Sequence, residues 1–239
     1  LLKWLENVSF KRLVYSSTSE VYADSNTVGL LNIPTSEKVP VVFTQPTNTR
    51  FSYATSKFMG EFLCNHFGSS FNKEVSVIRY HNIYGPRMGS KHVIPEFILR
   101  FLNKDDPFVI YGGKETRAFC YIDDATKATM LVATTEECNG EIIHIGNSQE
   151  EISIIDLAQK MKDQFESSVD FQLLEGKSAS VKRRCPDTSK IHKLTGKCNT
   201  KEALRNTAST MRYCVPVYGT YLSWKDFTEN PSTISGVIA

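Results

Sequence analysis

The sequence predicts an α/β fold in which a mainly parallel sheet is covered by helices on both faces. Short apolar runs of strand length alternate along the chain with longer amphipathic segments, the usual pattern of parallel strands joined by crossover helices. Of the 239 residues, 41% are hydrophobic and 23% are charged, which suffices for one large core or two small ones. These features are typical of an ordinary globular α/β protein.

The first half of the chain alternates between strands and helices around one long loop. The apolar residues Phe58, Phe62 and Leu63 recur at helical spacing, whereas the strand segments are unbroken apolar runs. The loop holds three prolines among many Asn and Thr residues, and a loop of this length in a compact domain usually carries function. In chain order the expected elements are a helix end at 1–5, a buried strand at 12–16, a polar crest at 16–20, a loop at 23–50, a helix at 53–67 and a strand at 75–80.

The second half continues the alternation. A Gly112-Gly113 pair ends one expected strand, and Asp123 or Asp124 is expected to cap the helix that follows. The residues after 218 show no periodicity and are expected to form a tail. The remaining elements are a helix at 92–102, a strand at 108–111, an extended segment at 119–122, a helix reaching about 134, a strand at 141–145, a helix at 153–165 and weaker helices at 188–194 and 201–211.

Composition argues against several function classes. A net charge of +2 gives no strong field for nucleic acid, and no apolar run is long enough to span a bilayer. The six cysteines contain no C-x-x-C pair, and the five histidines lack metal-ligand spacing. We therefore expect no metal, nucleic-acid or membrane partner, and a cytoplasmic protein with free thiols.

Tyr53 and Lys57 are the first candidates for chemistry. At i and i+4 of a helix they lie on one face, where an ammonium stabilises a phenolate and makes a tyrosine usable as a general base. Tyr221 and Lys225 share this spacing, so the pair alone is a weak signal. Context favours the first pair, because the preceding strand ends in hydroxyl and carboxylate residues, and ligands of open α/β sheets bind beyond such strand ends.

Five blocks of the sequence, in this order and spacing, resemble the extended short-chain dehydrogenases. That family contains nucleotide-sugar 4-epimerases, 4,6-dehydratases and UDP-glucuronate decarboxylases, and the resemblance covers about residues 1–214. It implies the C-terminal part of a Rossmann-type doubly wound sheet plus a smaller α/β substrate domain. The blocks are Ser-Ser-Thr-Ser-Glu-Val-Tyr at 16–22, Tyr-Ala-Thr-Ser-Lys at 53–57, Arg-Tyr-His-Asn-Ile-Tyr-Gly-Pro-Arg at 79–87, Arg-Ala-Phe-Cys-Tyr-Ile-Asp-Asp at 117–124, and Arg-Arg-Cys-Pro-Asp with Ser-Lys at 183–190.

The resemblance also implies roles for individual residues and NAD as the cofactor. Tyr53 would take the proton of the sugar C4 hydroxyl, and Lys57 would hold the nicotinamide ribose. The implied catalytic residues are Thr18, Glu20, Tyr53 and Lys57; the implied cofactor-binding residues are Ser16, Ser17, Tyr53, Lys57 and Tyr80; the implied substrate-binding residues are Asn82, Val93, Tyr111, Arg117 and Arg184. The arginines suit a diphosphate because the planar guanidinium makes bidentate contacts.

The sequence departs from the family pattern in one important way. The G-x-x-G-x-x-G turn that cradles the pyrophosphate is not present, so we expect the chain to be N-terminally truncated and to bind NAD poorly by itself. Ala23 also stands where the family usually has Gly. The expected organisation assigns 1–88 and 115–146 to the C-terminal half of the NAD-binding domain, 89–114 and 147–218 to the nucleotide-sugar substrate domain, and 219–239 to the tail.

The residues after Thr18 bear on the reaction. The 4,6-dehydratases usually carry Asp then Glu there, whereas this chain has Ser19 and Glu20, as the UDP-glucuronate decarboxylases do. We therefore expect a 4-epimerase or a decarboxylase acting on a nucleotide-sugar, with UDP as the expected nucleotide. The alternatives are a 4,6-dehydratase and a truncated, non-catalytic paralogue. Met59, Leu63 and Phe67 give the helix at 53–67 a second apolar face, as in the family's homodimers, although these residues could equally pack inside the monomer.

Overall fold

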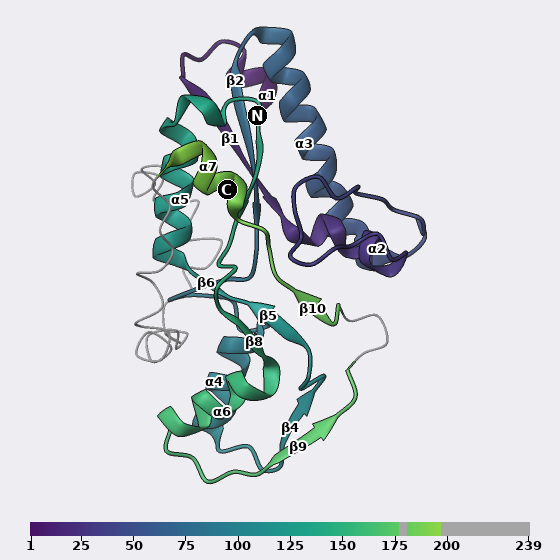
Figure 1. Ribbon diagram of the computed structural model, residues 1–239, viewed down its shortest axis with the longest axis vertical. Coiled ribbons are helices and arrows are strands. Elements are labelled where there is room, and N and C mark those ends of the chain that lie inside the picture. Colours follow the sequence, from purple (N-terminus) through teal and green to yellow (C-terminus); the bar gives the residue numbers. More distant parts are fainter. Residues whose placement is uncertain (177–180, 197–239) are drawn as a thin grey trace, which may run out of the picture.

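The computed structural model describes residues 1–176 and 181–196 and arranges them as two groups of elements, one above the other in Figure 1. The upper group contains the long helices α3 and α5 and the largest parallel sheet. The lower group contains helices α4 and α6 and strands β4 and β9. Short strands connect the two groups, and the candidate active site lies near this connection.

The upper sheet has the order β1-β2-β7 and is parallel throughout, as predicted. Its strands are β1 (Arg12–Thr18), β2 (Glu74–Tyr80) and β7 (Ile142–Ile145), and helices α3 (Ser52–Phe71) and α5 (Ile122–Thr134) cover its opposite faces (Figure 1). The prediction that the first strand is buried is wrong, since most of β1 is only half-buried. Within the described residues β1 pairs with β2 alone, so its other edge has no neighbouring strand.

The segment after β1 is more ordered than the predicted loop. A 3-10 helix η1 (Ser19–Tyr22) and a short helix α2 (Ala23–Thr27) follow the strand directly. The chain then crosses an irregular stretch to η2 (Thr49–Phe51), which leads into α3. The Thr18 hydroxyl oxygen accepts a hydrogen bond from the Glu20 backbone N–H at 3.2 Å and so caps η1. The predicted polar crest is therefore the end of β1 followed by a capped 3-10 turn.

The lower group encloses its own apolar core. Helices α4 (Val93–Asn103) and α6 (Ile154–Gln164) pack against the parallel pair β4 (Phe108–Tyr111) and β9 (Phe171–Leu174). Phe108 is fully buried and its ring contacts the rings of neighbouring phenylalanines from both helix and strand. The predicted helix at 92–102 and strand at 108–111 are confirmed to within one residue.

Short strands link the groups. Strand β3 (Ile83–Tyr84) pairs in parallel with β6 (Cys120–Tyr121). Strand β5 (Thr116–Ala118) lies between β10 (Arg183–Arg184), which is parallel to it, and β8 (Glu151–Ser153), which is antiparallel. These pairings bring segments that are far apart in the sequence to one place below the upper sheet.

The start of α5 differs from the prediction. Its N-cap is Tyr121, which makes no side-chain capping bond, while Asp123 and Asp124 lie in the first turn. The prediction that Asp123 or Asp124 is the N-cap is wrong, because the helix already begins at the apolar Ile122. The two carboxylates still interact favourably with the positive end of the helix dipole.

The remaining short helices are α1 (Leu2–Leu5), η3 (Glu136–Cys138) and α7 (Ser189–Thr195). Although the expected organisation placed 147–218 in the substrate domain, α7 packs on the upper group, where Ile191 joins the core beside β7. The predicted helix at 201–211, the tail at 219–239 and the Tyr221–Lys225 pair lie outside the described residues. In the described part of the chain, no helix combines the length and apolarity needed to cross a bilayer.

Candidate active site

A cleft of about 720 Å³ opens where β1 and β2 end, between the upper and lower groups. Strand β1 supplies its last residue, Thr18, and the first turn of α3 supplies Tyr53. The lower group closes the other side. Of the predicted site residues, those that line this cleft are Thr18, Glu20, Tyr53, Tyr80, Asn82, Val93, Tyr111, Arg117 and Arg184. The structure thus brings together residues spread over most of the described chain.

Tyr53 and Lys57 occupy the start of α3. The Tyr53 side chain is 54% exposed and lines the cleft together with Thr18. One turn further on, the Lys57 Nζ donates to the backbone carbonyl of Ser16 at 3.0 Å and lies 5.6 Å from the ring centre of Tyr15. Lys57 therefore connects the helix that carries the phenol to the strand that carries Thr18.

Two arginines line the cleft, and each has a carboxylate partner. Arg184 makes an ion pair with Glu20, and Arg117 donates to Glu115 at 2.8 Å. Burial and then the nearby Arg184 guanidinium lower the pKa of Arg117. Two neighbouring guanidinium groups are a good match for a diphosphate.

Tyr80 and Asn82 complete the floor. The Tyr80 hydroxyl makes a 2.8 Å hydrogen bond with the Thr129 hydroxyl of α5. Asn82 has a positive φ of 43°, a conformation that Asn adopts more easily than most residues, and its Nδ2 donates to the Ala118 carbonyl at 3.2 Å. Both side chains are therefore held in fixed directions by neighbouring elements.

Ser17 lies elsewhere. Because successive side chains of a strand point to opposite faces, Ser17 faces α3, and its hydroxyl donates to Glu61 at 2.5 Å in the protein interior. Its predicted contact with the cofactor therefore finds no support from the position of its hydroxyl. Among the described residues there is also no cluster of three His, Cys, Asp or Glu side chains arranged to hold a metal ion.

Several residues of the cleft were not among the predicted site residues. Ser19, Ile83 and Phe119 stand in the quoted blocks but were given no contact with substrate or cofactor. Glu115 lies two residues before Arg117, at the spacing that places side chains on one face of a strand, which is a usable hint. The rest come from distant segments that only folding brings together. The cleft residues that sequence reasoning missed are Ser19, Ile83, Met88, His92, Glu115, Phe119 and Ile154.

Behind the cleft, two buried histidines predict a pH-dependent stability. Burial lowers the pKa of His144 to about 3, and burial followed by His144 lowers the pKa of His81. Tyr22, Arg79 and Glu37 also face His144. The unfolded chain protonates both imidazoles below about pH 6.5 while the folded chain does not, so stability falls as pH drops below that value.

The expected slope is about 1.4 kcal/mol per pH unit for each histidine between pH 6.5 and the folded-state pKa. Thermal melts between pH 7.5 and pH 5 would measure it. The variant His144→Gln retains an acceptor for Tyr22 but cannot titrate, and it should show a shallower dependence than the wild type. An unchanged slope in that variant would contradict the assignment.

The chain is similar to proteins of one enzyme family. The family model described as "NAD dependent epimerase/dehydratase family" matches residues 1–146. A UDP-N-acetyl-alpha-D-glucosaminuronate decarboxylase from Bacillus cytotoxicus is 39% identical over 161 residues, which are 66% of this chain and 47% of the relative. A dTDP-D-glucose 4,6-dehydratase from Dictyostelium discoideum is 34% identical over 67% of this chain and 37% of the relative. The chain thus spans less than half the length of these two relatives.

Solved structures give the same result. The UDP-glucuronic acid 4-epimerase from Bacillus cereus, in complex with UDP-glucuronic acid and NAD, superposes with a TM-score of 0.71 at 26% identity, over 89% of this chain and 65% of that one. A UDP-N-acetylglucosamine 4-epimerase from Methanobrevibacter ruminantium M1 gives a TM-score of 0.73 at 27% identity, over 87% and 64%. The predicted Rossmann-type fold and the resemblance to the extended short-chain dehydrogenases are confirmed. The chain belongs to the NAD-dependent epimerase/dehydratase family.

Proposed function

We propose that the protein containing this chain uses NAD to oxidise C4 of a nucleotide-sugar and works through a 4-keto intermediate. The observation that carries this proposal is that Thr18, Tyr53, Arg117 and Arg184 all line one cleft of about 720 Å³. A candidate general base, a hydroxyl and two cations thus share a space of substrate size. The relatives act on nucleotide-sugars by name, which supports the same substrate class.

In this proposal Tyr53 accepts the proton of the C4 hydroxyl, and Thr18 donates a hydrogen bond to the reacting oxygen. Lys57, held against Ser16, stabilises the phenolate electrostatically. NAD, when bound, accepts the hydride from the sugar carbon. Its nicotinamide ribose would be held by Lys57, with Tyr80 and the backbone of β1 around it, while the glycine-rich turn for its pyrophosphate is not within residues 1–239.

The substrate diphosphate would contact Arg117 and Arg184, whose guanidinium groups then exchange carboxylate partners for phosphate oxygens. Asn82 would meet the diphosphate or the sugar. Val93 and Tyr111 would border the base, for which we propose uracil. In terms of organisation, we propose 1–88 with 115–146 as the cofactor-binding part and 89–114 with 147–218 as the substrate-binding part, except that α7 packs on the cofactor-binding part.

For the reaction itself we propose 4-epimerisation or decarboxylation. Glu20 lines the cleft with Thr18 and Tyr53, so a carboxylate is at hand beside the candidate base once Arg184 turns to the diphosphate. The alternatives are a 4,6-dehydratase, which the Ser19 position argues against, and a non-catalytic binding protein. All four possibilities use the same cleft, so the structure does not distinguish them and the reaction products have to be identified.

The experiment incubates the full-length protein with NAD and a panel of UDP-sugars that includes UDP-glucuronate and UDP-N-acetylglucosaminuronate, and identifies products by NMR. Carbon dioxide release selects decarboxylation, and interconversion of C4 epimers selects epimerisation. A 4-keto-6-deoxy product would select the dehydratase. Tight binding of nucleotide-sugar without any product would select the non-catalytic alternative.

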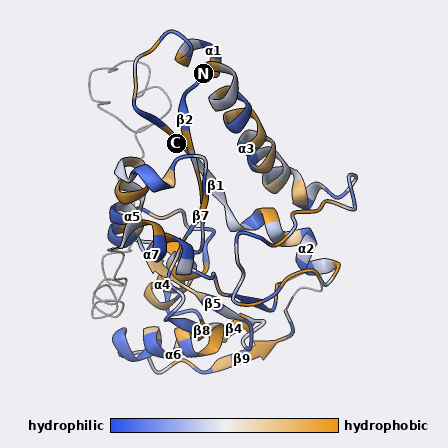
Figure 2. Ribbon diagram, turned by 45° about the horizontal axis from the view of Figure 1, so that its top comes forward, coloured by the Kyte–Doolittle hydropathy of each residue, from blue (hydrophilic) through white to orange (hydrophobic). Residues whose placement is uncertain are grey.

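We propose that the partners are the nucleotide-sugar and a second copy of the chain in the cytoplasm, with neither nucleic acid nor membrane involved. On α3, Met59, Phe62 and Leu63 are each more than half exposed, and Figure 2 shows polar and apolar residues mixed along this helix. Phe67 was expected on this face but is buried in the monomer. A dimer built on α3 should become monomeric in light scattering when Met59→Glu and Leu63→Glu are combined.

A further inference from the structure

A buried ion pair lies directly behind the candidate active site. Glu61 of α3 and Arg79 of β2 are each 3% exposed. Arg79 donates from Nε at 2.9 Å and from Nη2 at 2.6 Å to the two carboxylate oxygens of Glu61. Neither side chain lines the cleft. A bidentate pair of this kind fixes both the distance and the orientation between the two elements that carry it.

The pair is bonded to both ends of the segment that supplies Thr18 and Glu20. On one side, the Ser17 hydroxyl donates to the same Glu61 carboxylate at 2.5 Å. On the other side, Arg79 Nη1 donates to the Tyr22 hydroxyl at 2.5 Å. The residues between Ser17 and Tyr22, which reach into the cleft, are therefore anchored before and after.

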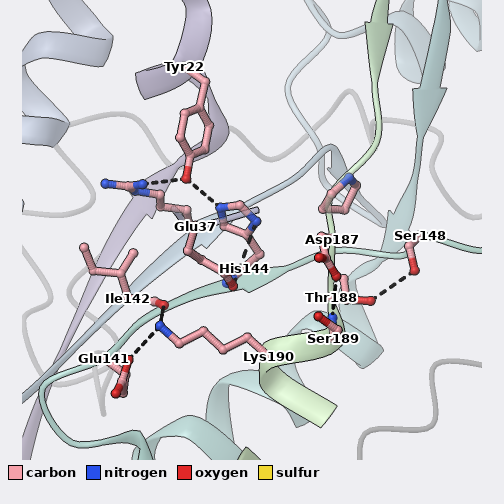
Figure 3. Close-up of polar contacts among 12 residues, drawn as sticks. Tyr22, Glu37, Glu141, Ile142, His144, Ser148, Asp187, Thr188, Ser189 and Lys190 are labelled. Carbon is pink, nitrogen blue, oxygen red and sulfur yellow. Dashed lines mark hydrogen bonds and ion pairs between the residues drawn. The ribbon is translucent and has the colours of Figure 1, made fainter. Parts of the chain in front are cut away.

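Tyr22 extends the network to the third strand of the sheet. Its hydroxyl lies 2.8 Å from Nε2 of His144, and Figure 3 shows the phenol pointing at the imidazole. Burial raises the pKa of Tyr22 to about 12, so the phenol keeps its proton, and the low pKa of His144 leaves its ring neutral. Tyr22 thus accepts from Arg79 and shares a hydrogen bond with His144, which links α3 and β2 to β7.

The same network determines how α3 sits on the sheet. Tyr53, Lys57 and Glu61 are spaced four residues apart and lie on one face of the helix. Lys57 is bonded to the backbone of β1, and Glu61 is bonded to β1 and β2 one turn further on. Two attachments one turn apart fix the rotation and the axial position of α3, and so decide where Tyr53 stands relative to Thr18.

Stability alone does not require charges here. Removing two charges from water is costly, and apolar residues of similar volume often replace a buried ion pair without loss of stability. We propose that Glu61 and Arg79 are positioning residues that hold Tyr53 and Lys57 in register with Thr18 and Glu20. The inference rests on the proposed function for the reaction, but the placement of α3 is measurable without it.

The test is the double variant Glu61→Leu with Arg79→Met in the full-length protein. We expect kcat to fall about 10- to 100-fold, because a displacement of about 1 Å costs this much, while the KM for the nucleotide-sugar changes little. A crystal structure of the variant should show that the 3.0 Å contact between Lys57 Nζ and the Ser16 carbonyl is lost.

The chain offers a matched control. Arg12 of β1 and Glu74 of β2 form a 2.8 Å ion pair at the ends of these two strands that lie farthest from the cleft. Replacing them by Met and Leu, respectively, should lower stability while kcat stays within about threefold of the wild type, since rates respond to misplacement at the site. Should the Glu61–Arg79 variant not fold, Ser17→Ala removes only one bond of the network and should lower kcat by about 3- to 10-fold.

Each outcome has a clear meaning. A folded Glu61→Leu, Arg79→Met variant with wild-type kcat and an intact Lys57–Ser16 contact overturns the proposal, as does a control variant that loses kcat equally. If the wild type turns over no nucleotide-sugar, the proposed function fails. The crystal structures then still decide whether this pair positions α3.

Discussion

The variant Tyr53→Phe is expected to lose turnover by about 10³-fold or more while keeping its fold. The substitution removes only the hydroxyl, and general base catalysis contributes about 10²- to 10⁴-fold to rates. The Tyr53 side chain is 54% exposed, so loss of its hydroxyl leaves no buried polar partner unsatisfied and should change the free energy of unfolding little. Product formation by NMR and a thermal melt of the same preparation measure the two effects.

The sequence supplies the control for this experiment. Tyr221 and Lys225 have the same spacing as Tyr53 and Lys57, so Tyr221→Phe tests whether spacing or position matters. The proposal assigns the proton transfer to Tyr53, which lines the cleft with Thr18, and Tyr221→Phe should therefore keep the wild-type rate. A Tyr53→Phe variant with a rate within about threefold of the wild type would rule out Tyr53 as the base.

The second large effect concerns stability. Glu61→Ala should lower the free energy of unfolding by about 3–5 kcal/mol, because it leaves the Arg79 guanidinium buried without a carboxylate and with the Tyr22 hydroxyl as its hydrogen-bond partner among the described residues. Urea denaturation followed by circular dichroism gives the value. The loss is expected to be much larger than the net contribution of one ordinary hydrogen bond, which is about 1 kcal/mol.

The double variant Glu61→Leu, Arg79→Met should have most of the stability that Glu61→Ala loses. It leaves no unpaired guanidinium in the protein interior, because Arg79 is replaced as well. The recovery separates the cost of an unpaired charge from the loss of packing. If the double variant is as unstable as Glu61→Ala, packing rather than charge is the cause. An exposed pair would give much smaller values, about 0–1 kcal/mol.

Periodicity predicted most of the fold because local spacing reflects which face of an element is buried. Strand β2, helix α3 and helix α6 lie within a few residues of their predicted ranges. Two predictions were wrong because residue spacing does not determine the property in question. The burial of β1 depends on whether a strand pairs with its second edge. The first residue of α5 depends on how Ile122 packs.

The candidate site divides in the same way. Tyr53 and Lys57 could be identified from the sequence because one helical turn separates them, and Thr18 and Glu20 because they end an apolar strand. The network of Glu61, Arg79 and Tyr22 could not, because its members are 18 to 57 residues apart. Tyr22 and Arg79 stand in two of the quoted blocks, but nothing in a single sequence pairs them with each other or with Glu61.

By itself the sequence determined the family, the parallel α/β architecture and the residues that would perform the proposed chemistry. Only the tertiary structure decided that Ser17 points away from the cleft, that Arg184 and Glu20 meet across 164 positions of sequence, and that a buried ion pair ties the helix of Tyr53 to the sheet. The physical reason is that side-chain type and spacing are local properties. Burial and charge pairing depend on which distant segments meet when the chain folds.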